Sequence, residues 1–222
     1  MQVIDLEVAA VLFDLDGTLV DSTASVLRAW TAVAAELGVP LAEFEPYMHG
    51  IPGPQVFATV LPEMPPELAR ALAARMNAEQ ARDTDGVRAI PGAIMALRGL
   101  PLSRWAIVTS GDHRLATARI AAAGLPTPRV LVTSDDVRAG KPDPECYLAA
   151  ASRLGRAPAG CLVVEDAPAG VAAGRAAGMP VLGVLTTYRD LDADMTTGDL
   201  STVDFRADSS GIRVTSHNRA ER

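Results

Sequence analysis

A run of six apolar residues near the start of the chain, residues 8–13, leads directly into an acidic turn. Continuous apolar side chains of this length are typical of a strand that is buried on both faces of a parallel sheet. Such a strand would deliver Asp14 and Asp16 to its carboxyl end, where Gly17 permits a tight turn. Open parallel sheets bind their ligands at that edge. The sequence therefore predicts a ligand site with two carboxylates, one able to attack and one able to handle protons.

The simpler alternative is a β-turn, because Asp and Gly favour turns for backbone reasons alone. A second Asp-x-Asp-Gly, with Asp83, Asp85 and Gly86, provides an internal comparison. It follows a polar stretch and ends no apolar strand. We interpret the second copy as a loop and the first as a site.

Composition limits the class of partner. With 20 basic and 27 acidic residues among 222, the formal net charge of −7 favours neither nucleic-acid nor membrane binding. We therefore expect a small-molecule substrate and no obligate protein partner. Cys146 and Cys161 form no metal-ligand pattern, which favours a reducing compartment. No apolar stretch is long enough to span a bilayer and residues 2–7 lack the basic region of a secretory signal, so a cytoplasmic protein is expected.

Strand-like apolar runs alternate with alanine-rich helical patterns over most of the chain. This alternation is the signature of βα units, and the expected fold class is α/β, with a Rossmann-like, doubly wound parallel sheet. Residues 23–82 instead read as helices without a convincing strand. We interpret them as an inserted all-helical cap over residues 21–87, with the catalytic core in residues 1–20 and 88–222.

The end of the chain differs from the rest. Residues 215–222 are polar and have no apolar periodicity. Chain ends of this kind are commonly frayed. We expect no functional role for this tail.

Polar groups follow further predicted strands, and they suit phosphoryl transfer. Thr109, Ser110 and Gly111 follow the apolar residues 105–108. Their hydroxyls and exposed amides can hold the oxygens of a phosphoryl group. Taken alone, however, this tripeptide is usually a loop.

Lys141 is the single lysine among the 20 basic residues. Its compact charge suits a crowded pocket better than the planar fork of arginine does. The flanking Gly140 and Pro142 would stiffen its loop. The alternative is a surface lysine that takes no part in a site.

Two adjacent acids, Glu165 and Asp166, follow the apolar residues 162–164 and precede a predicted helix. The ordinary explanation is that acidic side chains complement the dipole of that helix. Asp14 and Asp16 are predicted at the same edge of the sheet, however, and such a cluster of carboxylates would need a cation. Mg²⁺ prefers sparse oxygen ligation of this kind.

Taken in order, these groups spell Asp14-x-Asp16-Gly-Thr18, Thr109, Lys141 and Glu165-Asp166. This pattern resembles that of the haloacid dehalogenase-like hydrolase superfamily. Because the cap lies between the first and second motifs, the chain is similar to the subgroup with sugar phosphatases, phosphoglycolate phosphatase and β-phosphoglucomutase. The resemblance covers nearly the whole chain.

The resemblance implies a two-step reaction. Asp14 would attack phosphorus and form an aspartyl-phosphate, while Asp16 would protonate the leaving alcohol and then activate water. Lys141 and Mg²⁺ would suppress the repulsion between a carboxylate and a phosphate dianion. Thr109 would hydrogen-bond the phosphoryl group.

The resemblance also implies the ligands of phosphate and metal. The phosphate-binding residues would be Asp14, Leu15, Asp16, Thr109, Ser110, Gly111 and Lys141. The Mg²⁺ ligands would be Asp14, the backbone carbonyl of Asp16, Asp166 and, directly or through water, Glu165.

Choice of the leaving group is expected to depend on the cap. No Lys or Arg occurs between Arg28 and Arg70, and His49, in a Gly/Pro-rich turn, is the candidate cation of that stretch. In β-phosphoglucomutase-like caps a cationic residue in this loop helps to hold a second phosphate, so its absence weakens a mutase interpretation. The alternative is that His49 is an exposed side chain that takes no part in the site. The same alternative applies to His113.

The expected function is a Mg²⁺-dependent phosphatase of a small phosphomonoester: a sugar, polyol or glycosylated metabolite phosphate. The alternatives are a β-phosphoglucomutase-like phosphomutase, or a phosphatase of a nucleoside 5′-phosphate or of a phosphorylated ribosyl natural product. A catalytically idle phosphate-binding module would have no reason to keep Asp16, whose contribution is proton transfer. A haloacid dehalogenase would not need the acids of the metal site.

Overall fold

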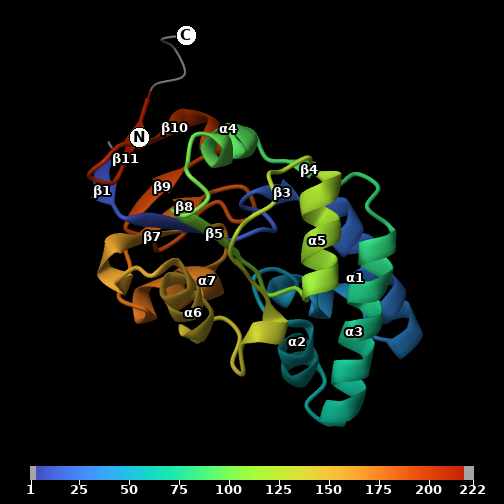
Figure 1. Ribbon diagram of the computed structural model, residues 1–222. Coiled ribbons are helices and arrows are strands. Elements are labelled where there is room, and N and C mark those ends of the chain that lie inside the picture. Colours follow the sequence, from blue (N-terminus) through green and yellow to red (C-terminus); the bar gives the residue numbers. More distant parts are fainter. Residues whose placement is uncertain (1–3, 218–222) are drawn as a thin grey trace.

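A six-stranded parallel sheet lies at the centre of the computed structural model, which describes residues 4–217 (Figure 1). In spatial order its strands are β6 (Leu131–Val132), β5 (Trp105–Val108), β2 (Ala10–Phe13), β7 (Cys161–Glu165), β8 (Val181–Val184) and β9 (Met195–Thr197). The last four residues of the first apolar run form the central strand β2, between β5 and β7. Val8 instead ends β1 (Asp5–Val8), which belongs to another sheet, so the single strand expected over residues 8–13 is shorter than predicted. The predicted α/β fold with a Rossmann-like parallel sheet is confirmed.

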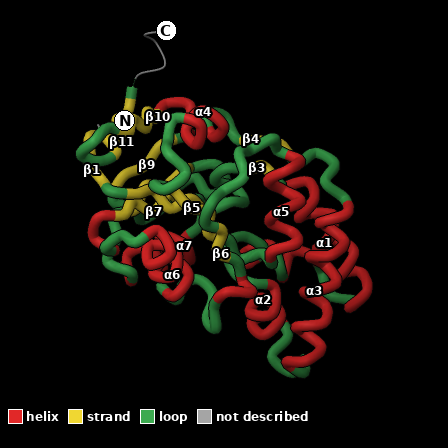
Figure 2. The backbone as a smooth tube through the Cα atoms, in the orientation of Figure 1, coloured by secondary structure: helices red, strands yellow, loops and turns green. Residues whose placement is uncertain are grey.

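Helices cover both faces of this sheet (Figure 2). One apolar core contains residues of α4 (Ala93–Arg98) and α5 (His113–Ala122), and the other contains residues of α6 (Glu145–Leu154) and α7 (Pro168–Ala176). Successive side chains of a strand point to opposite faces. In β2, Phe13 therefore joins the first core and Leu12 joins the second, which explains why this strand is apolar at every position.

A small antiparallel sheet joins the two ends of the described chain, with the order β1 (Asp5–Val8), β11 (Ile212–Ser216), β10 (Val203–Ala207). The prediction of a frayed tail is wrong for Thr215 and Ser216, which pair within this sheet. The physical reason is that Ile212 and Val214 are buried on alternate positions and carry the strand onward beside β1. Residues 218–222 of the tail lie outside the described residues.

Three helices stand apart from the sheet: α1 (Thr23–Leu37), α2 (Gly53–Val60) and α3 (Pro66–Arg82), with 3₁₀ turns η1 (Leu41–Glu43) and η2 (Glu45–Tyr47) between α1 and α2. We call these elements the cap helices (Figure 1). They have an apolar core of their own, in which the ring of Trp30 lies 5.2 Å from that of Phe44 and 5.4 Å from that of Phe57. The boundaries of the cap, 21–87, stay a prediction.

The chain enters and leaves the cap helices side by side. Strand β3 (Val20–Asp21) pairs antiparallel with β4 (Arg88–Ala89). Just before β4, the second Asp-x-Asp-Gly has neither helix nor strand structure, as interpreted from the sequence, and Asp83 accepts a hydrogen bond from Arg28 Nε at 2.9 Å. The second copy is therefore a surface turn that is held by an arginine.

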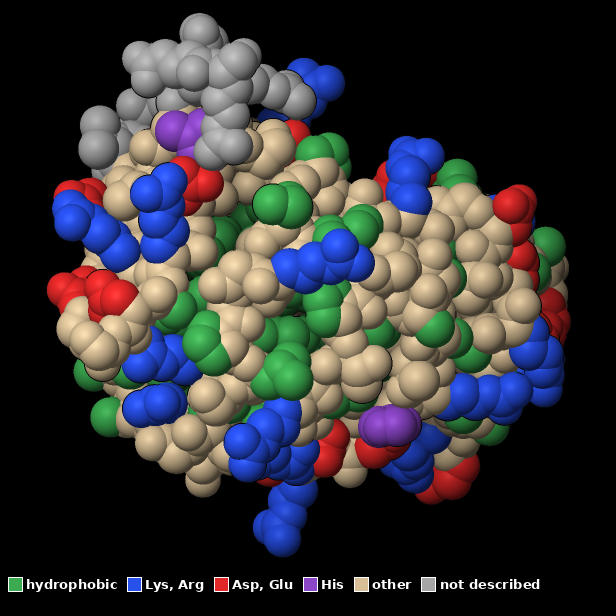
Figure 3. Space-filling model, turned by 45° about the horizontal axis from the view of Figure 1, so that its top comes forward, with side chains coloured by type: hydrophobic (Ala, Val, Ile, Leu, Met, Phe, Trp, Pro, Cys, Tyr) green, Lys and Arg blue, Asp and Glu red, His purple; other side chains and the backbone are tan. Residues whose placement is uncertain are grey.

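The remaining 3₁₀ turns are η3 (Ser134–Asp136), η4 (Pro158–Gly160) and η5 (Leu200–Thr202). On the face drawn in Figure 3, basic and acidic side chains are interspersed, with apolar side chains exposed between them. None of the helices in residues 4–217 has the length and apolar character needed to cross a membrane. Cys146 and Cys161 are both buried and free.

Candidate active site

Polar side chains converge at the carboxyl edge of the parallel sheet, where the sequence predicts them. Asp14 follows β2, Thr109 follows β5, and Glu165 and Asp166 lie at the end of β7, while Lys141 comes from the loop before α6. All five are buried. Parallel strands end at one edge, so residues from distant parts of the chain meet there.

Lys141 joins two of these carboxylates. Its Nζ lies 2.5 Å from Oδ1 of Asp14 and 2.6 Å from Oε1 of Glu165, and its side chain is only 1% exposed. Burial lowers the pKa of Lys141, but Asp14 and Glu165 outweigh this effect and raise it well above its usual value. The lysine is therefore a fixed positive charge beside Asp14.

Glu165 is fully engaged within the protein. Besides Lys141, its Oε1 accepts a hydrogen bond of 3.0 Å from the hydroxyl of Tyr147, whose ring also lies 5.2 Å from Nζ of Lys141. Its Oε2 accepts hydrogen bonds from the backbone N–H groups of Asp166 and Ala167, at 2.8 and 3.1 Å. Glu165 thus holds Lys141 in place, and sequence reasoning missed Tyr147 because only the packing of α6 under the sheet edge brings it there.

Asp166 is the carboxylate with spare capacity. Its Oδ1 accepts a hydrogen bond of 3.2 Å from the hydroxyl of Thr18, whereas its buried Oδ2 has no hydrogen-bond partner within residues 4–217. Burial, with a further contribution from Glu165, raises the pKa of Asp166 to about 8, although the hydroxyls of Thr187 and Thr18 and the charge of Lys141 oppose the shift. Gly17, at φ 86°, leaves the room for this carboxylate, because an added Cβ would overlap it.

The donor set fits a divalent cation. Oxygens of Asp14, Glu165 and Asp166 lie within 4.8 Å of one another. Burial raises the pKa of Asp14 well above its usual range, and the two other carboxylates add to the shift while Lys141 opposes it. Three buried carboxylates share one ammonium group, so the cluster is short of positive charge. An oxygen-ligated Mg²⁺ would supply it.

Asp16 has different partners from Asp14. Its Oδ1 accepts a hydrogen bond of 2.7 Å from the hydroxyl of Ser22, and its Oδ2 forms an ion pair with Arg119 Nη1 at 2.5 Å. Arg119 belongs to α5, is 4% exposed, and was not among the predicted site residues. The available signal was its position on the inward face of α5, three residues before the end, where Leu115 and Ile120 are buried.

The predicted phosphate-binding groups lie around the same point. Thr109 Oγ1 accepts a hydrogen bond of 3.1 Å from the backbone N–H of Gly111, and Ser110 Oγ donates to the backbone carbonyl of Gly50 in the loop before α2 at 3.1 Å. The side chain of Leu15 is fully buried in the apolar core. Only the backbone of Leu15 is therefore available to a phosphate.

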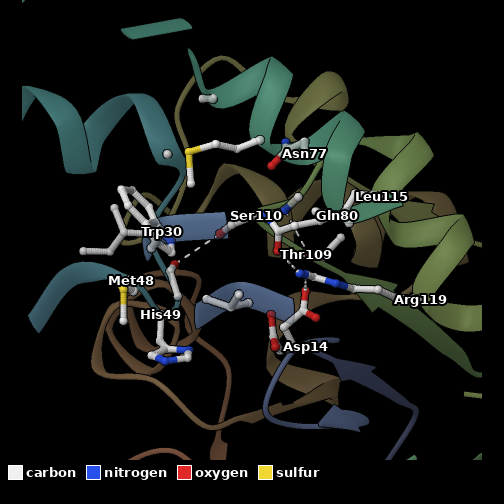
Figure 4. A pocket seen from close by; sticks show the side chains of 18 residues that line it. Asp14, Trp30, Met48, His49, Asn77, Gln80, Thr109, Ser110, Leu115 and Arg119 are labelled. Carbon is white, nitrogen blue, oxygen red and sulfur yellow. Dashed lines mark hydrogen bonds and ion pairs between the residues drawn. The ribbon is translucent and has the colours of Figure 1, made fainter. Parts of the chain in front are cut away.

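A cavity of about 90 Å³ lies between this edge and the cap helices (Figure 4). Its walls include Asp14, Asp16 and Thr109 from the sheet side. Trp30 and Gln80 are among those that face them from the cap helices. The two carboxylates therefore open into one small, shared space.

His49 also lines this cavity, and its part in holding the leaving group stays a prediction. Burial lowers the pKa of His49 below the usual value, Asp16 opposes this effect and Arg119 adds to it. Arg119, which the sequence did not single out, places a guanidinium in the same wall. His113 lines a separate cavity with Thr127 and Arg129.

Known sequences and structures resemble this chain over most of its length. A family model for haloacid dehalogenase-like hydrolases matches residues 8–178. Hexitol phosphatase A of Escherichia coli (strain K12) is 45% identical, over 78% of this chain and 81% of that protein. Validoxylamine A 7′-phosphate phosphatase of Streptomyces hygroscopicus subsp. limoneus is 35% identical, over 86% of this chain and 94% of that protein. The crystal structure of a hydrolase from Pseudomonas syringae superposes with a TM-score of 0.78 at 30% identity, over 87% of this chain and 94% of that one.

A substitution of Gly170, in the first turn of α7, tests the packing around Glu165, the carboxylate that holds Lys141 in place. A Cβ at this position would overlap the carboxylate of Glu165. Although alanine favours helices over glycine, we expect Gly170→Ala to lower the free energy of unfolding in urea by about 1–3 kcal/mol, because the added methyl group overpacks the site. The control is Gly198→Ala, whose Cβ would meet no atom within 4 Å. Equal stability of the two variants would contradict the packing described for Glu165.

Proposed function

The chain belongs to the haloacid dehalogenase-like hydrolases, and on that premise we propose that it removes phosphate from small sugar or polyol phosphates through a covalent intermediate on Asp14. Its phosphatase relatives identify the reaction class as phosphoric monoester hydrolysis. The observation that carries the finer proposal is the placement of Asp14. This carboxylate is buried, paired with Lys141, and opens into a cavity that it shares with Asp16.

Asp14 is the nucleophile in this proposal. A carboxylate attacks a phosphate dianion only when the charge repulsion between them is reduced. Lys141 supplies one fixed positive charge next to Asp14, and Glu165 and Tyr147 keep the ammonium group from turning away. Thr109 is near enough, at the end of the neighbouring strand, to hold a phosphoryl oxygen.

Asp16 moves the protons. In the first step the bond between phosphorus and the leaving oxygen breaks, that oxygen takes a proton from Asp16, and a bond forms between phosphorus and Asp14. In the second step Asp16 takes a proton from water as the water oxygen attacks phosphorus. The bond to Asp14 then breaks, and inorganic phosphate leaves with Asp16 protonated again.

Asp14, Asp166 and the backbone carbonyl of Asp16 are the groups that would hold Mg²⁺. The unpartnered Oδ2 of Asp166 and the shortage of positive charge support this assignment. When bound, Mg²⁺ supplies charge neutralisation at the phosphoryl oxygens. We assign Glu165 to Lys141, because each oxygen of Glu165 already accepts hydrogen bonds from the protein.

The cavity supports a small and neutral leaving group. At about 90 Å³ it is well below the ~300–1,000 Å³ that is common for drug-sized ligands. The polar groups that α3 adds to its wall include the neutral amides of Asn77 and Gln80, which suit hydroxyl groups. Two relatives are named for phosphates of hexitols and of validoxylamine A, which agrees with a hydroxyl-rich leaving group.

A phosphate-release screen tests this function. With Mg²⁺ present, we expect kcat/KM for hexitol and hexose phosphates to exceed that for nucleoside 5′-phosphates by about tenfold or more, because the cavity is small and offers neutral amides. The control is Asp14→Asn, for which we expect a loss of about 10³-fold or more on every ester. Transfer of phosphate within one sugar, with little release, would favour a mutase, and inert esters would contradict a phosphatase.

Removal of the metal gives an independent test. We expect chelation to abolish phosphate release and added Mg²⁺ to restore it. Asp166→Asn removes one charged ligand, so the Mg²⁺ concentration for half-maximal rate should rise by about tenfold or more. Asp192→Asn, which removes an exposed carboxylate paired with Arg175, is the matched control and should leave that concentration unchanged. Full activity after exhaustive chelation would rule out the metal site.

A further inference from the structure

We propose that Arg119 is a positioning residue that couples the placement of the cap helices to the orientation of Asp16. The inference rests on the proposed function, since it assigns Arg119 a role through the proton transfers of Asp16. It concerns a residue that contacts two parts of the molecule at once. One part is the carboxylate at the sheet edge, and the other is helix α3.

Arg119 spans the boundary between the sheet and the cap helices. From α5, its Nη1 pairs with Asp16 Oδ2 at 2.5 Å, and its Nη2 donates to Oε1 of Gln80 at 2.6 Å. Gln80 is itself buried, on the cap helix α3. Figure 4 shows the guanidinium between Gln80 and the carboxylates at the base of the cavity.

The chemistry of the guanidinium makes this contact directional. Its nitrogens are fixed in one plane, so hydrogen bonds from Nη1 and Nη2 to different partners set the orientation of the whole group. A lysine has a single rotating head and would not transmit such a constraint. Gln80 therefore determines how the plane of Arg119 meets the carboxylate of Asp16.

Arg119 is not fully satisfied as a structural arginine would be. Its Nε is buried without a hydrogen-bond partner within the described part of the chain. Buried donors of native proteins are almost always paired, and an exception needs an explanation. At Arg119 the two Nη groups bind the acid and the cap helix together, and Nε is left without a partner. The positioning role rests on these two contacts of the Nη groups.

Asp16 depends on two donors for its own orientation. Ser22 occupies Oδ1 and Arg119 occupies Oδ2, at 2.7 and 2.5 Å. With both in place, the carboxylate is held in the wall of the cavity that Asp14 also lines. A catalytic acid that is misplaced by about 1 Å loses much of its rate. Displacement of Gln80 would therefore shift Arg119, and the shift of Arg119 would misplace the carboxylate of Asp16 that transfers the proton.

The cap helix α3 offers a matched comparison. Asn77, one turn before Gln80, donates from Nδ2 to Oδ2 of Asp112 at 2.9 Å. This hydrogen bond also joins α3 to the sheet side, and Asn77 also lines the cavity. Asp112 caps the start of α5 and is not a partner of Asp16. Asp112→Asn removes the acceptor for Asn77 while asparagine can still cap α5, so it weakens the docking of α3 without acting on Arg119.

Leaving groups of different basicity separate positioning from docking. The alkoxide of a polyol phosphate needs a proton as it leaves, whereas p-nitrophenolate leaves without one. A change at Asp16 therefore slows release of the polyol and spares release of nitrophenolate. A loss of substrate binding or of folding slows both.

The experiment measures single-turnover release from a hexitol phosphate and from p-nitrophenyl phosphate, each at saturating concentration with Mg²⁺, for wild type, Gln80→Leu, Arg119→Lys and Asp112→Asn. For Gln80→Leu and Arg119→Lys we expect polyol release to slow by about tenfold or more, with nitrophenolate release changed by less than about threefold. For Asp112→Asn we expect the ratio of the two rates to equal that of wild type, because Asp112 is not among the residues that line the cavity. Gln80→Leu removes the acceptor without altering the buried charge, so it tests the coupling if Arg119→Lys fails to fold.

Equal slowing of both esters by Gln80→Leu, or no slowing of either, would overturn the inference. The same shift in the Asp112→Asn ratio would overturn it too, because docking of α3 alone would then explain the effect. A wild type that releases neither group contradicts the proposed function itself. An active wild type whose variants keep the wild-type ratio would instead contradict only the role of Arg119.

Discussion

The candidate site depends on one buried cation, Lys141, between Asp14 and Glu165. Burying charges is costly unless each one is paired, and loss of one partner leaves the others uncompensated. The two distances of 2.5 and 2.6 Å satisfy this condition for the ammonium group. They also tie the loop before α6 to the ends of β2 and β7, so the same contacts that place Asp14, the proposed nucleophile, hold the sheet edge together.

The two acids of the first motif differ in their environment. Asp14 is buried among other carboxylates beside Lys141, whereas Asp16 is held by Ser22 and Arg119 at the boundary with the cap helices. Pairs of titratable groups in contrasting surroundings are commonly divided between different roles in catalysis. In the proposed mechanism, attack falls to Asp14 inside the sheet edge and proton transfer to Asp16, whose partner Arg119 contacts the cap helix α3.

The parts of the site that the sequence predicts are those that depend on local pattern. Apolar runs locate the ends of the strands, so Asp14 and Lys141 were expected at one edge, and the structure places them together. The helical pattern of α5 places Arg119 on the same face as Leu115 and Ile120, but its partners depend on how α5 packs against α3, which no local pattern records. The small antiparallel sheet was missed for a related reason, because it joins Ile4 to Ser216 across 212 positions of sequence.

The central claim is that Asp14 carries the phosphoryl group during turnover. The most direct measurement is an acid quench within the first turnover of a phosphate ester with Mg²⁺, followed by mass mapping of the peptides. We expect one phosphoryl group on Asp14, formed as the alcohol is released and lost as inorganic phosphate appears. Release of phosphate at the same rate with no phosphorylated peptide at any time, or with the group on another residue, would contradict the claim.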